Sequence, residues 1–150
     1  MNDTPMIQSL FTYRLHVLKK QTDKAMNEAF SDGIALTLTE ARVLLSVGSF
    51  GALSVSDLGK ASNLDRSQAS RATDILERKG LVEKTSNATD GRGVVVTLTT
   101  KGKRTYGRAA AIAQAQNDEI LGALLPAERK AIHSMLTKLV AAQCAEELAE

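Results

Sequence analysis

The feature that most constrains the fold is a change of hydrophobic period at Gly80. The segment before it repeats apolar residues at the three- and four-residue steps of a helix. After it, residues 81–84 favour an extended segment, and residues 94–98 (Val-Val-Val-Thr-Leu) are the most β-prone run in the chain. Residues 85–93 between them are rich in Ser, Asn, Thr, Asp and Gly, which is typical of a loop. A helix followed by a β-hairpin with a polar tip is predicted.

Helical periodicity also marks the segments on either side. Thr37 with Glu40, and Asp65 with Gln68, have the spacing of capping boxes, in which each side chain bonds the backbone N–H of the other residue. Gly33 is expected to close the first helix in the left-handed conformation, and Gly48 and Gly51 to mark the turn after the second. The predicted helices cover residues 5–30, 38–47, 54–62, 66–79, from 99 or 100 to 124, and from 126 onward.

The order of these elements predicts the fold class. It is mainly α with a small β-hairpin, and the third and fourth helices are joined by a tight connection. This order resembles a helix-turn-helix followed by a wing. With only 3% aromatic residues and no Trp, the core is expected to consist of Leu, Ile, Val, Ala and Met.

The composition argues against several classes of protein. The single cysteine, Cys144, excludes an intrachain disulfide and a multi-cysteine metal site. No glycine-rich phosphate loop, metal-ligand cluster or nucleophilic serine motif is present, so neither an enzyme nor a cofactor is expected. No apolar run approaches the roughly 20 residues that span a bilayer. The amino-terminal residues carry no signal-peptide pattern, and we expect a cytoplasmic protein without membrane association.

The charges are distributed unevenly. The net charge is only +2, but Lys and Arg are concentrated between Arg66 and Arg108, whereas the carboxyl-terminal forty or so residues are more acidic. This pattern fits a molecule with one surface that faces an anion.

Short motifs across most of the chain resemble the MarR (multiple antibiotic resistance regulator) family of winged-helix transcriptional regulators. Two positions depart from the family pattern: Gly59 stands where Ala is usual, and Leu125 where Ser is common. The motifs are significant because they occur in order at compatible spacing. They are Leu36–Thr37, Val43–Leu44, Ser54–Gly59, Leu64–Arg71, Leu76–Val82, Asp90–Arg92, Leu98–Gly102 and Leu124–Glu128.

The helix after Asp65 is predicted to enter the major groove of DNA. Its amino terminus offers free N–H groups and a positive dipole end to phosphates. Gln68 suits adenine, and Arg71 suits guanine or phosphate. Taken alone, these side chains read as an ordinary solvated helix face. In the helix-turn-helix context the predicted DNA contacts on this helix are Arg66, Ser67, Gln68, Ser70 and Arg71.

The hairpin is predicted to supply further DNA contacts. The family resemblance implies that Arg92 enters the minor groove and that Asp90 orients it. Lys84 is expected beside a phosphate. The alternative for Asp90 and Arg92 is a tight turn stabilised by their own ion pair.

The resemblance further implies a homodimer that binds a pseudo-palindromic operator. In this prediction residues 36–99 form the DNA-binding region, and residues 1–35 and 100–150 form a helical dimerisation region intertwined with it. The resemblance also implies a repressor released by a small aromatic or phenolic ligand. The candidate ligand-binding residues are Tyr13, Arg14, His16 and Lys20.

Two alternatives stay open at this point. One is a winged-helix protein-interaction module without DNA binding, although Arg66, Arg71 and Arg92 are all retained. The other is a metal-sensing repressor, for which His16, His133 and Cys144 are few and scattered, so no metal site is expected.

Overall fold

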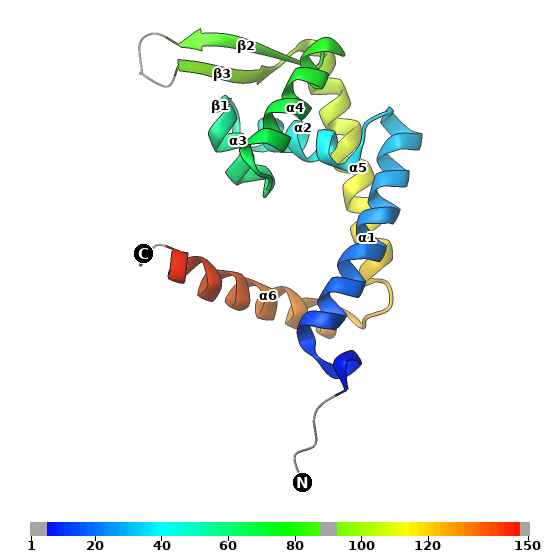
Figure 1. Cartoon of the computed structure of the whole chain (residues 1–150). Coiled ribbons are helices and arrows are strands. Elements are labelled where there is room, and N and C mark those ends of the chain that lie inside the picture. Colours follow the sequence, from blue (N-terminus) through cyan, green and yellow to red (C-terminus); the bar gives the residue numbers. More distant parts are fainter. Residues whose placement is uncertain (1–5, 88–92, 148–150) are drawn as a thin grey trace. The chain divides into compact units, whose positions relative to one another are not determined.

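The computed structural model describes residues 6–87 and 93–147, and it has the predicted mainly α fold with a small sheet (Figure 1). The chain divides into two compact units, residues 1–116 and 117–150. The elements in order are η1 (Ile7–Ser9), α1 (Phe11–Ile34), α2 (Leu38–Phe50), β1 (Leu53–Ser54), α3 (Val55–Ser62), α4 (Arg66–Arg78), β2 (Val82–Asn87), β3 (Gly93–Leu98), α5 (Thr100–Leu121) and α6 (Pro126–Glu147).

Local capping signals begin most of the helices where the sequence predicts. Both halves of the capping boxes at the starts of α2 and α4 are present, with Thr37 paired to Glu40 and Asp65 paired to Gln68. Thr99 caps α5, because its hydroxyl accepts a hydrogen bond from the Gly102 N–H at 2.9 Å. These caps satisfy amides that have no partner inside the helix.

The two departures from the family pattern have local explanations. A Cβ atom added at Gly59 would lie 3.2 Å from the Leu64 carbonyl oxygen, so the smaller residue relieves a tight approach between α3 and the following turn. At the start of α6, Leu125 offers no side-chain cap, but the Glu128 carboxylate accepts from the Leu125 N–H at 2.7 Å. Half of a capping box therefore remains.

The ends of α1 differ from the prediction. The helix begins at Phe11, after a short 3-10 turn and the extended backbone of Leu10. It continues through Gly33, and Ala35 adopts the left-handed conformation at φ 54° in its place. Gly33 instead lies against α5: a Cβ atom there would lie 2.6 Å from the terminal Cδ1 atom of Ile112, which would have to shift.

Gly48 likewise lies inside a helix rather than in a turn. The second helix runs on to Phe50, and only Gly51, at φ 82°, ends it. A Cβ atom on Gly48 would lie 2.2 Å from the Tyr106 ring. Both Gly33 and Gly48 therefore let α5 approach closely, a need that local sequence does not reveal.

The sheet contains one more strand than predicted. The strand order is β1-β3-β2, and both pairs are antiparallel. β1 pairs Leu53 with Val96, and it is too short to have a strand period of its own. β2 also continues to Asn87, beyond the predicted Lys84, because polar residues pair with β3 along the hairpin.

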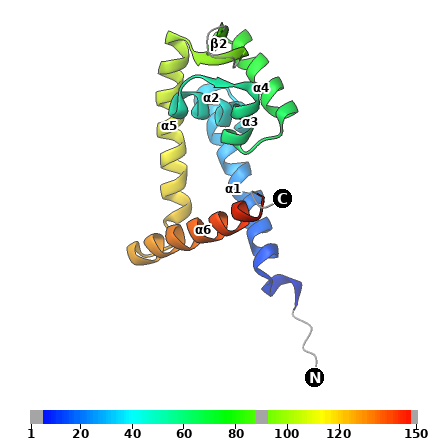
Figure 2. The same cartoon turned by 90° about the vertical axis from the view of Figure 1, so that its left-hand side faces the viewer.

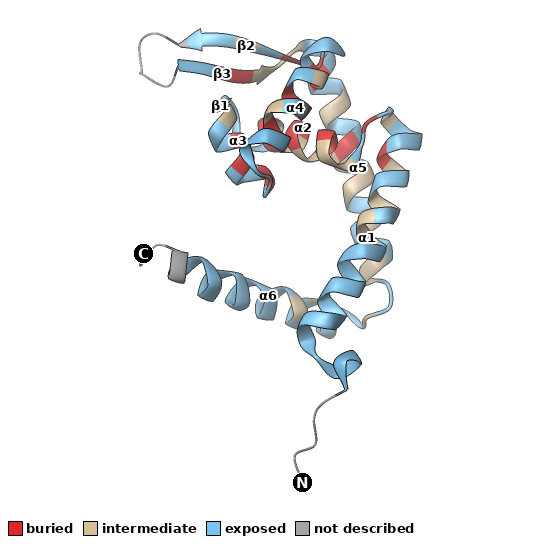
Figure 3. Cartoon of the chain, in the orientation of Figure 1, coloured by how far each residue is buried: buried red, intermediate tan, exposed pale blue. Residues whose placement is uncertain are grey.

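The core lies where α2, α3, α4 and β3 meet, as the buried residues in Figure 3 show. Its largest fully buried members include Leu44, Leu58, Leu76 and Val96, as expected, but also Phe30, an aromatic residue that the expected core of Leu, Ile, Val, Ala and Met did not include. By contrast, all residues from Met6 to Gln21 are exposed, and so is nearly all of α6.

Among residues 6–87 and 93–147, no single helix has the length and apolar character required to cross a membrane. α1 and α2 pass that test of length and composition only when taken together, and they are bent by 74° at the break between them.

Candidate DNA-binding surface

The helix-turn-helix is built from α3, a three-residue connection (Asn63–Asp65) and α4. Ser54 caps α3 by accepting from the Asp57 N–H at 3.1 Å, and Asn63 ends the helix in the left-handed conformation. The Leu64 N–H then donates to the Gly59 carbonyl at 2.8 Å. Asp65 starts α4 immediately afterwards, so the turn holds the beginning of α4 against the end of α3.

One face of α4 packs and the other faces solvent. Ala69, Ala72, Thr73 and Leu76 are buried against the rest of the winged helix. Four of the five predicted contact residues on α4 are exposed, and Ser70 is half-buried. The structure therefore brings Arg66, Ser67, Gln68, Ser70 and Arg71 together at the amino-terminal half of one helix.

Two of these side chains already have partners within α4. The Gln68 Oε1 atom accepts from the Asp65 N–H at 3.3 Å, as part of the capping box. The Arg71 Nη1 atom donates to the Ser67 hydroxyl at 2.7 Å. Reading of an adenine by Gln68 would require its carboxamide to leave the cap, whereas Arg71 is held over the exposed face by Ser67.

Lys84 on β2 is paired rather than free. Its ammonium group donates to the Asp74 carboxylate of α4. This hydrogen bond to Lys84 holds the pKa of Asp74 below its ordinary value, and the same contact raises the pKa of Lys84 against the opposing effect of burial. The pair links α4 to β2 of the hairpin, and any phosphate that contacts Lys84 has to compete with Asp74.

The predicted wing residues Asp90 and Arg92 lie outside the described residues. The strands that lead to them pair from Val82 opposite Leu98 to Asn87 opposite Gly93. Gly93, the first residue of β3, has φ 69°, a conformation that favours glycine.

A pocket of about 320 Å³ adjoins the exposed face of α4. Thr37, Thr39 and Glu40 from the start of α2 line it together with Gln68 and Arg71. Sequence reasoning did not associate the α2 residues with this surface. No signal in the sequence marks such a neighbour, because the contact joins residues about thirty positions apart in the chain.

The candidate ligand residues Tyr13, Arg14, His16 and Lys20 are all exposed on α1. Arg14 is turned toward the chain before the helix, where its Nε atom donates to the Gln8 carbonyl at 3.1 Å. None of the four lines the pocket beside α4. Within one chain, the described residues do not enclose them.

Within the described part of the chain, no group of three or more His, Cys, Asp or Glu side chains is arranged to hold a metal ion. Cys144 is an exposed free thiol on α6.

A family model, individual relatives and solved structures were each compared with this chain, and all three point to one family. A sequence model described as the MarR family matches residues 36–94. The HTH-type transcriptional regulator BilQ of Clostridium symbiosum is 26% identical over 134 residues, which is 89% of this chain and 92% of BilQ. The multiple antibiotic resistance protein MarR of Escherichia coli is 33% identical over 88 residues, 59% of this chain and 60% of that protein.

Solved structures have the same fold. BpsR of Bordetella bronchiseptica, whose DNA binding is described as regulated by 6-hydroxynicotinic acid, matches with a TM-score of 0.81 and 25% identity over 91% of this chain and 96% of that one. A mutant MarR from Escherichia coli complexed with operator DNA matches with a TM-score of 0.75 and 27% identity, over 85% of this chain and 91% of that one.

Proposed function

The chain belongs to the MarR family of transcriptional regulators, and from that premise we propose that it binds operator DNA as a homodimer and releases it when a small ligand binds. The observation that carries the proposal is the solvent face of α4. Cationic and hydrogen-bonding side chains gather there at the start of a capped helix that a winged-helix scaffold holds rigidly. The mutant MarR structure with operator DNA has the same fold.

The DNA contacts that we propose differ in role. Arg66, Ser67 and Ser70 contact phosphates near the start of α4, where the helix dipole favours an anion. Arg71 contacts a base edge or a phosphate, and Gln68 reads a base once its carboxamide leaves the cap. On the wing we propose that Lys84 contacts a phosphate and that Arg92, oriented by Asp90, enters the minor groove.

The dimer is supported by apolar side chains that a single chain leaves in water. Phe11 is 58% exposed on α1, and Met135 and Val140 are 55% and 60% exposed on α6. Exposed apolar stripes on helices of this length indicate a protein interface. We propose that residues 1–35 and 100–150 form the dimerisation region and residues 36–99 the DNA-binding region. A dimer then presents two α4 helices to a pseudo-palindromic operator.

The ligand response is supported by the fold shared with BpsR, whose DNA binding is described as regulated by 6-hydroxynicotinic acid. We propose repression that a small, aromatic or phenolic molecule relieves. Tyr13, Arg14, His16 and Lys20 are candidate contacts that only a second protomer would enclose. A regulator of this kind acts where the DNA is, so a cytoplasmic location is part of the proposal.

The alternative functions are weaker. An interaction module without DNA binding does not account for the exposed cationic side chains of α4. A metal-sensing repressor requires a ligand cluster, and the described residues hold none. No enzymatic role is proposed, since the relative BilQ is named as a transcriptional regulator.

The test is fluorescence anisotropy with duplexes selected from a random pool, measured over a salt series. Arg71→Ala and Arg92→Ala are expected to weaken binding by about tenfold or more, because a specific base contact contributes roughly 1–3 kcal/mol. Lys130→Ala, which removes an exposed cation from α6, is the matched control and is expected to leave the affinity unchanged. If no duplex is selected even at low salt, the DNA-binding function is wrong and the interaction module replaces it.

A further inference from the structure

Glu40 is the one charged residue that is buried in the described part of the chain, with 7% of its surface exposed. Glutamate is almost never buried unless its charge is paired. The capping box with Thr37 explains the position of Glu40 at the start of α2, but a capping box forms equally well on an exposed helix. The burial of this carboxylate therefore requires a partner from elsewhere in the fold.

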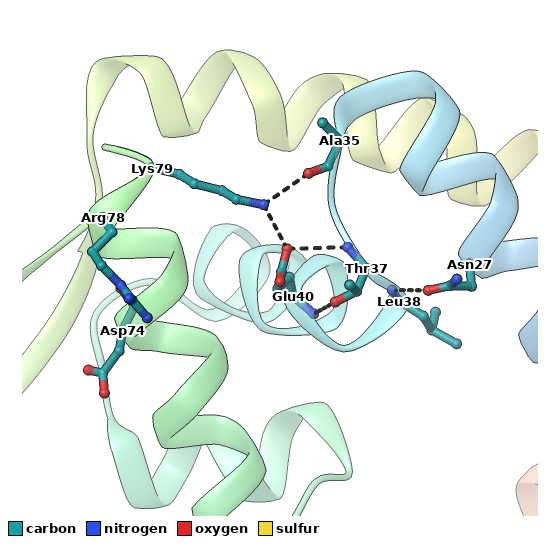
Figure 4. Close-up of polar contacts among 8 residues, drawn as sticks. All are labelled: Asn27, Ala35, Thr37, Leu38, Glu40, Asp74, Arg78 and Lys79. Atoms are coloured by element: carbon teal, nitrogen blue, oxygen red, sulfur yellow. Dashed lines mark hydrogen bonds and ion pairs between the residues drawn. The ribbon is translucent and has the colours of Figure 1, made fainter.

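That partner is Lys79, which directly follows the last residue of α4 (Figure 4). The Glu40 Oε2 atom accepts from the Thr37 N–H at 3.2 Å and from the Lys79 Nζ atom at 3.1 Å. The same Nζ atom donates at 3.0 Å to the carbonyl of Ala35, the left-handed residue that ends α1. One ammonium group therefore joins the end of α4 to the end of α1 and to the start of α2.

Two further contacts fix the helices around the Glu40–Lys79 pair. The Asn27 Oδ1 atom on α1 accepts from the Leu38 N–H at 2.9 Å, so α1 caps the first turn of α2. The Lys101 Nζ atom of α5 donates to the Lys79 carbonyl at 3.1 Å. α1 and α5 leave the winged helix on the same side (Figure 2), and both belong to the proposed dimerisation region. The pair thus connects the end of α4 to the helices that we assign to the dimer.

In a dimer this connection has a geometric consequence. A two-fold axis relates the protomers, so a rotation of α4 relative to α1 occurs in both and changes the separation of the two α4 helices. One extra base pair between half-sites displaces a half-site by about 3.4 Å and turns it by about 35°. A dimer accepts such a change only when its α4 helices can move relative to α1.

We propose that Glu40 is a positioning residue for operator recognition. Through Lys79 it fixes the end of α4 to the end of α1, and thereby sets the half-site spacing that the dimer accepts. The inference rests on the proposed function and assigns Glu40 no contact with DNA. Spacing between half-sites is then controlled separately from the reading of bases by Gln68 and Arg71.

Two other roles of Glu40 would leave the accepted spacing unchanged. In one, Glu40 only stabilises α2 through the capping box. In the other, its charge repels phosphates, since Glu40 lines the pocket beside α4 together with Gln68 and Arg71. Glu40→Gln tests the first role, because glutamine at this position retains the capping box but loses the charge-assisted hydrogen bond to Lys79.

The test measures the affinity of the full-length protein for three duplexes by fluorescence anisotropy. One carries the selected operator, one carries that operator with a base pair inserted between its half-sites, and one carries a single half-site. The ratio of the first two affinities is the spacing selectivity. A partly unfolded preparation lowers both affinities alike, so this ratio does not report stability. The unmodified protein is expected to bind the lengthened operator about tenfold or more weakly.

Variants assign the effect to the ion pair. Glu40→Gln and Lys79→Gln are each expected to lower the spacing selectivity by about threefold, a size that a partly exposed ion pair supports, without changing the affinity for the single half-site. Lys79→Arg retains the cation and is expected to retain the selectivity. Two controls are expected to change neither quantity: Glu28→Gln removes an exposed carboxylate from α1, and Lys19→Gln breaks an ion pair within α1.

Hydrogen exchange in the DNA-free protein tests the connection itself. The N–H groups of Ala35 and Leu36 donate to carbonyls at the end of α1, and the Lys79 N–H donates to one at the end of α4. Glu40→Gln is expected to speed the exchange of all three by about threefold. The Asn63 N–H at the end of α3 is expected to exchange at an unchanged rate.

An unchanged spacing selectivity in both Glu40→Gln and Lys79→Gln would overturn the proposal and leave the proposed function intact. An equal fall in the Glu28 and Lys19 variants, or a fall in Lys79→Arg as large as in Lys79→Gln, would also overturn it. Tighter binding of the single half-site by Glu40→Gln would instead make the carboxylate a repulsive group at the DNA surface. Faster exchange at the ends of α1 and α4 in a protein that binds no duplex would support the connection and reject the proposed function separately.

Discussion

At the scale of single residues, the Asp74–Lys84 pair has the most direct bearing on function. It connects α4 to β2, and it holds one of the proposed DNA contacts in an ion pair within the free protein. Lys84 therefore contributes less to DNA binding than its position suggests. Removing the charge of Asp74 is expected to free the Lys84 ammonium group and so increase its contribution to DNA binding.

Asp74→Asn is expected to raise DNA affinity at low salt. The freed Lys84 ammonium neutralises one more phosphate, so the slope of log affinity against log salt is expected to steepen by about 0.9. Anisotropy titrations over a salt series measure both quantities. Glu28→Gln removes an exposed carboxylate from α1 and controls for the change in overall charge. Identical slopes for the two variants would contradict a specific role of Asp74.

The same pair predicts a pH dependence of stability. Because pairing lowers the pKa of Asp74, its contribution to stability is complete above the unfolded value, about 3.9, and is lost as the pH falls through the lower folded value. Lys84, with a raised pKa, loses its contribution only as the pH rises above about 10.4. The difference in unfolding free energy between the protein and Asp74→Asn is expected to stay constant from pH 5 to 9 (values within both limits). A difference in unfolding free energy that changes near pH 7 would show that a group other than Asp74 or Lys84 is responsible.

At the scale of elements, close approach to α5 determines several residue choices. Gly102 is buried in the first turn of α5, and a Cβ atom there would lie 1.8 Å from the Leu81 carbonyl oxygen. That oxygen accepts from the Thr99 N–H at 3.1 Å, so it is fixed where the wing returns to the helix. The glycine therefore joins α5 to the start of β2.

Gly102→Ala is expected to destabilise the fold by about 2–3 kcal/mol or more, in the range of overpacked sites that require a backbone shift. Gly107→Ala, on the same helix, meets nothing within 4 Å and is expected to stabilise it by up to about 1 kcal/mol through helix propensity. Urea denaturation measures both changes. Equal changes in unfolding free energy at Gly102 and Gly107 would show that the Leu81 carbonyl does not exclude a side chain at position 102.

The elements also show which parts of the fold and of the candidate site could be predicted from the sequence. Capping boxes and the β-prone run predicted α2, α4 and β3, because those signals lie within a few residues of each other. Gly33 and Gly48 were misassigned, since their roles depend on Ile112 and Tyr106 in a distant helix. The partner of Lys84 and the pocket beside α4 were missed for the same reason: each depends on a tertiary contact.

At the scale of the whole molecule, the exposed apolar stripes determine the proposed assembly. Leu136 and Leu139 are 41% and 45% exposed on α6, and Leu15 and Leu18 are 45% and 51% exposed on α1. A dimer that covers such side chains gains roughly 25 cal/mol for each Å² of apolar area removed from water.

The double variant Leu136→Glu/Leu139→Glu is expected to be monomeric at micromolar concentration, because two carboxylates would be buried without partners in the interface. Sedimentation velocity measures the mass of the particle. Lys138→Glu, an exposed residue of the same helix, is the control and is expected to remain dimeric. A double variant that keeps its dimer would place the interface elsewhere and remove α6 from the dimerisation region.

The exposed thiol of Cys144 is the only one in the chain, and the sequence contains no tryptophan. A maleimide dye or nitroxide therefore attaches at one defined point on α6 in each protomer without any prior mutation, and no indole emission overlaps with the optical signal. In a homodimer the two labels form a matched pair. Their separation, measured by energy transfer or dipolar spectroscopy, reports changes in the assembly as duplex DNA is added to otherwise native protein.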